Sequence, residues 1–211
     1  MMTSNQFLET LKKETKEAGV QLRLYDREVV NKSSSNTIPC TGYFCAGIPP
    51  TMAVCTASEA WLGVAIHEYH HMQQWLEKHE TFELEGDDEI DQWVCGKAEY
   101  RSAELNKYFK NVIRCEEDCE RRSLRYIKKH ALPINPELYA QEANSYLFFL
   151  HAVKYCRLWY PPDVPPYLCP ILRKAMPKHL KHDHTKPYKL ELFVDFLRDN
   201  HILHKKHKTE N

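Results

Sequence analysis

The stretch AIHEYHHMQQW, residues 65–75, places three histidines and a glutamate between large apolar residues. The surrounding apolar residues recur at helical spacing from about Glu59 to Lys78, and they fall on more than one side of that helix. A helix that is apolar on several sides lies inside a domain. Because burying imidazoles and a carboxylate costs several kcal/mol unless they are paired or metallated, the stretch predicts a central helix that carries a polar site.

Within this helix, His67 and His71 are four residues apart, so they lie one turn above the other on one face, close enough to hold one ion. Glu68 points about a quarter-turn away, where it can reach a water on that ion without ligating it. This HExxH pattern also occurs by chance in unrelated proteins. The apolar helix and a predicted strand leading directly into it favour zinc, and we assign His70 to the surroundings of the site or to the surface.

A catalytic zinc takes three protein ligands and keeps one open position. Glu104 falls on a solvated face of the next long predicted helix, whereas Glu120 interrupts an apolar stripe of that helix. We therefore expect Glu120 to be the third ligand, with Glu116, one turn earlier, as its substitute. The full set of candidate glutamates is Glu99, Glu104, Glu116, Glu117, Glu120 and Glu142.

The overall composition excludes some partners. The 211 residues include 29 Lys and Arg and 29 Asp and Glu, so no net field draws the chain to nucleic acid or to an anionic membrane. We find neither a secretory signal pattern nor an apolar run long enough to span a bilayer. We expect a cytoplasmic protein with reduced cysteines, a single domain over residues 1–200 and a basic, flexible tail over 201–211, whose partner is a peptide or protein substrate.

The periodicity of the rest of the chain predicts an α+β fold that is mostly helical, with a small antiparallel sheet packed on the central HExxH helix. Ser58 or Thr56 is expected to cap that helix. The stretch HLKHDH, residues 179–184, lies among prolines and lysines and predicts a solvated segment rather than a second metal site. Strands are expected over 20–26, 43–47 and 51–57. Further helices are expected over 4–18, over 92–129 with a bend near Gly96 or in the CEEDC run at 115–119, over 136–160 and from 189.

HEYHH followed by a downstream helical glutamate resembles the gluzincin type of zinc metallopeptidase, especially its small, uncharacterised phage-encoded members. DCERRSLRYI and PINPELYAQEANSYLFF are similar to stretches of such phage chains, so the resemblance covers about residues 40–160. It implies a zincin-like fold, a Zn²⁺ cofactor, the host cytoplasm as location, His67 and His71 as zinc ligands, Glu68 as general base and Glu120 as glutamate ligand.

One repressor-cleaving branch of that family has its third ligand three residues before an Ala-Asn pair. Here the pair is Ala143-Asn144, but the corresponding position is Ala140. Glu142 lies nearby, so it remains a rival for the third ligand.

These features predict a zinc-dependent hydrolase that cleaves peptide bonds, in which Glu68 takes a proton from a zinc-bound water and passes it to the leaving amine. Tyr139, Tyr146 or His151 could stabilise the oxyanion, although such residues more often belong to the core. Two alternatives stay open. One is a phage-type accessory protein whose structural zinc has four protein ligands, of which the fourth could be His70, Glu116 or a cysteine. The other is a di-iron carboxylate protein, for which Glu68 and His71 supply one ExxH element while the second is missing.

Overall fold

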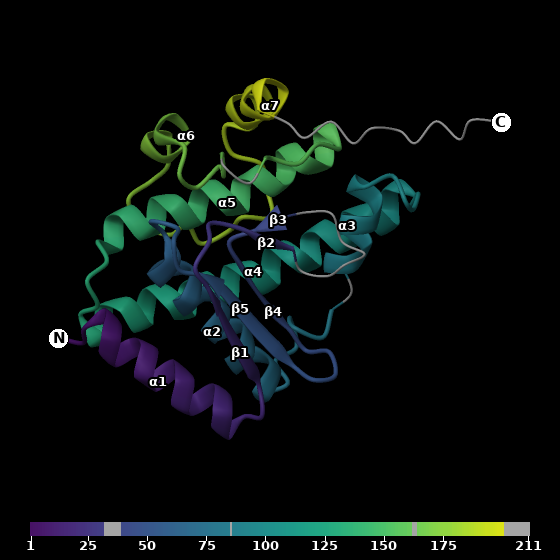
Figure 1. Ribbon diagram of the computed structural model, residues 1–211. Coiled ribbons are helices and arrows are strands. Elements are labelled where there is room, and N and C mark those ends of the chain that lie inside the picture. The colour runs from purple at the N-terminus through teal and green to yellow at the C-terminus, as the bar shows by residue number, and fades with distance from the viewer. Residues whose placement is uncertain (32–38, 85, 162–163, 201–211) are drawn as a thin grey trace.

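The computed structural model describes residues 1–31, 39–84, 86–161 and 164–200, so the predicted tail over 201–211 lies outside the described residues. The chain is mostly helical with small sheets, in agreement with the α+β prediction (Figure 1). The helices are α1 Ser4–Glu17, α2 Trp61–Leu76, α3 Asp87–Val94, α4 Ser102–His130, α5 Pro136–Cys156, α6 Pro170–Ala175 and α7 Leu190–Asp199.

The main sheet has three strands in the order β1-β5-β4, where β1 is Gln21–Tyr25, β4 is Gly42–Cys45 and β5 is Thr51–Cys55. Strands β4 and β5 form an antiparallel pair, but β1 and β5 are parallel. The prediction of an antiparallel sheet is therefore wrong, and the sheet is mixed. The reason is that a parallel partner needs a long connection, which residues 26–50 supply, and strand periodicity does not encode direction. A separate pair, β2 Val30–Asn31 with β3 Pro39–Cys40, is antiparallel.

Helix α2 lies between the three-stranded sheet and α4, and it contacts both (Figure 1). One apolar cluster joins α2 to α1 and the sheet through buried residues such as Phe7, Met52 and Ile66. A second cluster joins α3, α4, α5 and α7 through residues such as Phe109 and Phe149. The predicted central position of the HExxH helix is therefore seen in the structure, with one side on the sheet and the other on α4.

Two details of the helix boundaries differ from the predictions. Helix α2 is preceded by Ala60 without a side-chain cap, so neither Ser58 nor Thr56 is the N-cap residue; the Ser58 hydroxyl instead accepts a hydrogen bond from the Ala60 amide at 3.3 Å. The helix predicted over 92–129 is two helices, because Gly96 adopts φ +69° beyond the end of α3. Asp87, Asp88 and Glu89 form the first turn of α3, where their negative charges stabilise the helix N-terminus.

The prediction of a solvated segment at residues 179–184 is wrong for His184, which is fully buried. Its Nδ1 atom lies 3.1 Å from Glu117 Oε1, and its Nε2 atom lies 2.8 Å from Asn144 Oδ1. The Asn144 amide in turn donates to the carbonyls of Pro177 and His179. This segment is held against α4 and α5 by polar contacts that the local composition does not reveal.

The close approach of β4 to α2 requires a glycine. A Cβ atom at Gly42 would lie 2.5 Å from Val64 Cγ1 and 3.0 Å from the Ala53 carbonyl oxygen. We expect Gly42→Ala to lower the free energy of unfolding by about 1–3 kcal/mol, because one of these neighbours has to move. Urea unfolding measures the change. Gly47→Ala is the control, since its Cβ would meet only Cys45 Sγ at 3.4 Å; equal losses in the two variants would contradict the prediction.

Candidate metal centre

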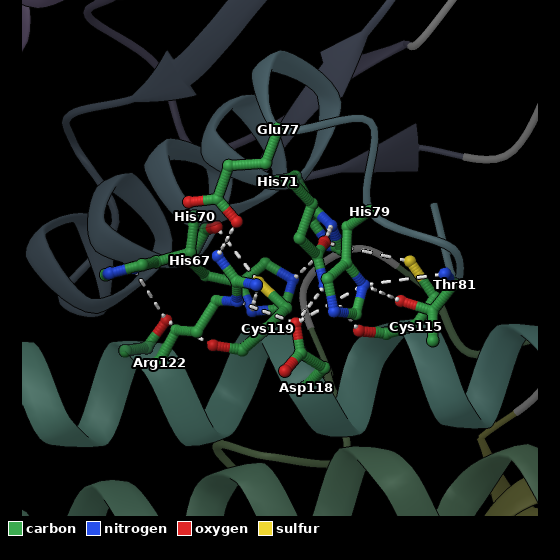
Figure 2. A network of polar contacts seen from close by, with 12 residues as sticks. His67, His70, His71, Glu77, His79, Thr81, Cys115, Asp118, Cys119 and Arg122 are labelled. Atoms are coloured by element: carbon green, nitrogen blue, oxygen red, sulfur yellow. Dashed lines mark hydrogen bonds and ion pairs between the residues drawn. The ribbon is translucent and has the colours of Figure 1, made fainter. Parts of the chain in front are cut away.

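Two histidines of α2 and a glutamate of α4 bring their polar atoms to one point. The Nε2 atoms of His67 and His71 lie 3.0 Å apart. The Glu116 carboxylate faces both rings, with Oε2 at 3.1 Å from His67 Nε2 and Oε1 at 3.4 Å from His71 Nε2. Each of these side chains is 15% exposed or less. Figure 2 shows the two histidines directed from α2 toward α4.

The other nitrogen of each ring has its own acceptor. His67 Nδ1 lies 3.2 Å from Glu120 Oε1, and the Tyr139 hydroxyl donates to Glu120 Oε2 at 2.6 Å. His71 Nδ1 lies 2.8 Å from Gln74 Oε1. A nitrogen that faces an oxygen acceptor carries the hydrogen, so in each neutral ring the Nε2 atom has the free lone pair.

These contacts fit a cation. Two Nε2 lone pairs and the Glu116 carboxylate converge, and within the described part of the chain Glu116 Oε2 makes no hydrogen bond despite its burial. Ligands on a tetrahedral zinc with bonds of about 2.0–2.1 Å are separated by about 3.3 Å. The separations of 3.0, 3.1 and 3.4 Å are close to that value. The donor set is also one that divalent transition metals accept.

A cysteine adds a sulfur to this region. His67, His71 and Cys119 could hold a metal ion, since one ligand atom from each lies within 4.8 Å of the others. The Cys119 Sγ atom lies 3.6 Å from His67 Nδ1 and donates to the His67 carbonyl oxygen at 3.1 Å, so it approaches the ring on its Nδ1 side. The sequence left a cysteine open as the fourth ligand of a structural zinc but did not single out Cys119. Its position three residues after Glu116 was the available signal, because residues three apart on a helix lie on the same face.

The electrostatics of the cluster favour bound positive charge. Burial lowers the pKa of His67, but Cys119 and Glu120 outweigh it, so the pKa lies well above its ordinary value. In the same way burial lowers the pKa of His71, and Cys119 and Glu116 raise it further than burial lowers it. Burial raises the pKa of Glu116, but the two histidines hold it well below its usual range. The cluster therefore requires cations, either protons on the imidazoles or a metal.

A cavity of about 580 Å³ opens beside the centre, and His67, Glu68 and Glu120 line it together with Tyr139 and Tyr146. The Glu68 side chain is buried and lies close to β4, because its Cγ atom would be 3.5 Å from a Cβ at Gly42. Burial raises the pKa of Tyr146 well above its ordinary value, so this hydroxyl keeps its proton at neutral pH. The predicted base, Glu68, thus lines the same cavity as His67, one member of the histidine pair.

The remaining predicted ligands make ion pairs away from the two histidines. Glu117 pairs with Arg121 and His184, whereas Glu142 lines the cavity and pairs with Arg173 at 3.2 Å. The other two are Glu99, which pairs with Arg157, and Glu104, which pairs with Arg101.

Two further histidines that the sequence singled out also lie apart from the cluster of Nε2 atoms. His70 is buried, with Nδ1 at 2.8 Å from the Ile66 carbonyl oxygen. The sequence analysis placed it either around the site or at the surface, and the surface placement is wrong. The Nε2 atom of His151 lies 2.8 Å from the His184 carbonyl oxygen. Among the described residues, neither of these two rings forms an ion pair with Glu116.

Comparisons of the chain with protein-family models, with curated proteins and with solved structures find no match. Among the described residues, none of the helices has the length and apolar character needed to cross a membrane. A functional assignment therefore depends on the chemistry of the cluster and its cavity.

Proposed function

We propose that this chain is a zinc-dependent metallopeptidase, a hydrolase of the gluzincin type. The observation that carries the proposal is the convergence of two Nε2 atoms and the Glu116 carboxylate at 3.0–3.4 Å, beside a cavity that His67 and Glu68 both line. The packing of a small mixed sheet on one side of the HExxH helix supports a zincin-like arrangement.

In this proposal His67, His71 and Glu116 hold the metal. The distances favour Glu116 over Glu120, because Glu120 Oε1 lies at Nδ1 of His67 rather than at Nε2. Glu120 then fixes the His67 ring by accepting its Nδ1 hydrogen, and Tyr139 fixes Glu120. In this proposal Glu120, the ligand expected from the sequence, orients His67 instead. Glu116, its expected substitute, takes the ligand position.

Bound zinc would supply a Lewis acid, which polarises a substrate carbonyl and makes water a better nucleophile. Glu68 accepts a proton from the attacking water and returns it to the leaving amine, because its carboxylate lines the same cavity as His67. The protonated Tyr146 hydroxyl, in the wall of that cavity, donates a hydrogen bond to the developing oxyanion.

A peptide is favoured as substrate by the position of β4. This strand is at the edge of the three-stranded sheet, and its first residue, Gly42, lines the cavity. An extended peptide can add to a sheet edge through backbone hydrogen bonds, which would bring a peptide bond past His67 and Glu68. This placement supports an endopeptidase rather than a hydrolase of small molecules.

The decisive experiment compares wild type with Glu68→Gln for metal content and for cleavage of a mixture of unstructured peptides, detected by mass spectrometry. We expect both proteins to hold about one zinc per chain. The variant should cleave at least about a hundredfold more slowly, since the carboxylate that moves the proton is gone. Glu59→Gln, at an exposed position of the same cavity, is the matched control and should retain cleavage. Zinc-loaded wild type that cleaves no peptide would contradict the proposal.

A second candidate function follows from Cys119. A structural metal site would use the sulfur as a fourth protein ligand together with His67, His71 and Glu116, leaving no position for water. In that case Cys119→Ser would lose metal about as strongly as a histidine variant, and neither wild type nor Glu68→Gln would cleave peptides. In the peptidase, Cys119→Ser keeps its metal and its cleavage.

A further inference from the structure

The fully buried Gln74 lies one turn beyond His71 on α2, and its side chain contacts the His71 ring at Nδ1. Its Oε1 atom is 2.8 Å from His71 Nδ1, on the side of the ring opposite to Glu116. Its Nε2 atom donates to the Cys115 carbonyl oxygen at 3.1 Å and to Asp118 Oδ2 at 2.9 Å. The Cys115 thiol also donates to Gln74 Oε1, at 3.8 Å, so both ends of the Gln74 amide are engaged.

Only one orientation of this amide satisfies these contacts. The carbonyl oxygen of Cys115 is an acceptor without a hydrogen, and the ionised carboxylate of Asp118 is another, so the atom facing them has to be the amide nitrogen. The oxygen consequently faces His71 Nδ1, which has to carry the hydrogen. The lone pair of the neutral ring is thereby fixed on Nε2, toward His67 and Glu116.

Asp118 is held in turn by basic residues at the end of this network (Figure 2). Arg122 Nε donates to Asp118 Oδ2 at 2.7 Å, and Arg122 Nη1 donates to Glu77 Oε2 at 2.8 Å. His79 Nδ1 lies 3.9 Å from the same Asp118 oxygen. The carboxylate is therefore kept ionised and pointed at Gln74, because rotating it away would cost Arg122 and Gln74 one hydrogen-bond acceptor each.

We propose that Gln74 and Asp118 are positioning residues that set the hydrogen of His71 on Nδ1 and so make the metal affinity of the centre depend on a network outside it. This inference uses only the metal-binding half of the proposed function. It assigns to His71 a neutral amide where His67 has a carboxylate, Glu120. His67 is thus oriented by Glu120 of α4, whereas His71 is oriented by Gln74 of its own helix, α2, which Asp118 of α4 holds in place.

The experiment is a titration of the metal-free protein with Zn²⁺ against a chromophoric chelator of known affinity. Gln74→Met keeps the shape of the side chain but removes the acceptor, and we expect a loss of affinity of about 10- to 100-fold. Gln73→Met is the matched control, because Gln73 points to Glu14 at 3.4 Å instead of to the centre; its affinity should stay within about twofold of wild type. Thermal unfolding of the metal-free variants shows that each of them is folded.

A rescue separates positioning from a general packing role. In Gln74→Glu, the new carboxylate can still accept from His71 but repels Asp118, so the affinity falls. Adding Asp118→Asn lets the Asn amide donate to the new carboxylate, and the double variant should recover to within about tenfold of wild type. Equal losses in Gln74→Met and Gln73→Met, or no recovery in the double variant, would overturn the inference while leaving the metal centre intact. Wild type without measurable Zn²⁺ affinity would overturn the metal centre and the inference together.

Discussion

Replacing Glu116 by Gln is expected to lower the affinity for Zn²⁺ by roughly 100- to 1,000-fold, and to abolish peptide cleavage at limiting metal. The figure follows from apparent binding free energies of about 10–16 kcal/mol for four-ligand zinc sites, or about 2.5–4 kcal/mol for each ligand. The physical reason is that Glu116 offers the only negative charge recorded within 3.4 Å of both Nε2 atoms among the described residues. A neutral amide does not replace it.

Glu120→Gln is the comparison that tests the ligand assignment. If Glu120 only orients His67, its removal should cost about 10- to 100-fold, less than the loss of Glu116. Glu104→Gln, on the same helix but in an ion pair with Arg101 at its start, should leave the affinity unchanged. Competitive titration of the metal-free proteins measures all three. A larger loss in Glu120→Gln than in Glu116→Gln would show that Glu120 is the ligand after all.

Wild type should lose about 2 kcal/mol more stability than His70→Asn when the pH falls from 7 to 5 in the presence of a chelator. Burial lowers the pKa of His70 to about 4, although the hydrogen bond to the Ile66 carbonyl opposes this shift. The unfolded value is about 6.5, so His70 is neutral in both states above that pH. Below about pH 6.5, His70 binds a proton in the unfolded chain but not in the folded chain. Stability is therefore lost from about pH 6.5 downward, with a limit of about 3 kcal/mol below pH 4.

The difference between the two proteins is the useful quantity in this experiment. His67 and His71 have raised pKa values, so their contribution has the opposite sign: it is present at low pH and is lost as the pH rises. These residues titrate in both proteins and cancel in the comparison. Urea unfolding at pH 7, 6 and 5 gives the free energies. His182→Asn, at an exposed position, controls for the loss of one histidine. An identical pH dependence of wild type and His70→Asn would refute the prediction.

The sequence by itself determined the local part of the site. Four-residue spacing on one helix places His67 and His71 together, and the apolar periodicity around them predicted the central position of α2 that the structure has. Both properties follow from the geometry of a single helix, which needs no knowledge of the rest of the chain. The alternation of apolar residues likewise located the three strands of the main sheet to within a few residues.

The sequence could reduce the candidates for the third metal ligand to a few glutamates, but it could not decide which of them lies nearest to the two histidines. Glu116 and Glu120 are one turn apart on the same helix, so they differ only by how far α4 is displaced along α2, a shift of about 6 Å. No local pattern encodes that displacement. In the structure it places Glu116 at the two Nε2 atoms and Glu120 at Nδ1 of His67.

Only the tertiary structure decided the contacts between segments that are distant in sequence. It made β1 and β5 parallel, it buried His184 between Glu117 and Asn144, and it brought Cys119 to His67. Each of these depends on the relative translation and rotation of packed elements, which the summed burial of all their faces determines. Helical spacing fixed which residues of HEYHH act together, whereas the register between α2 and α4 decided which groups surround them.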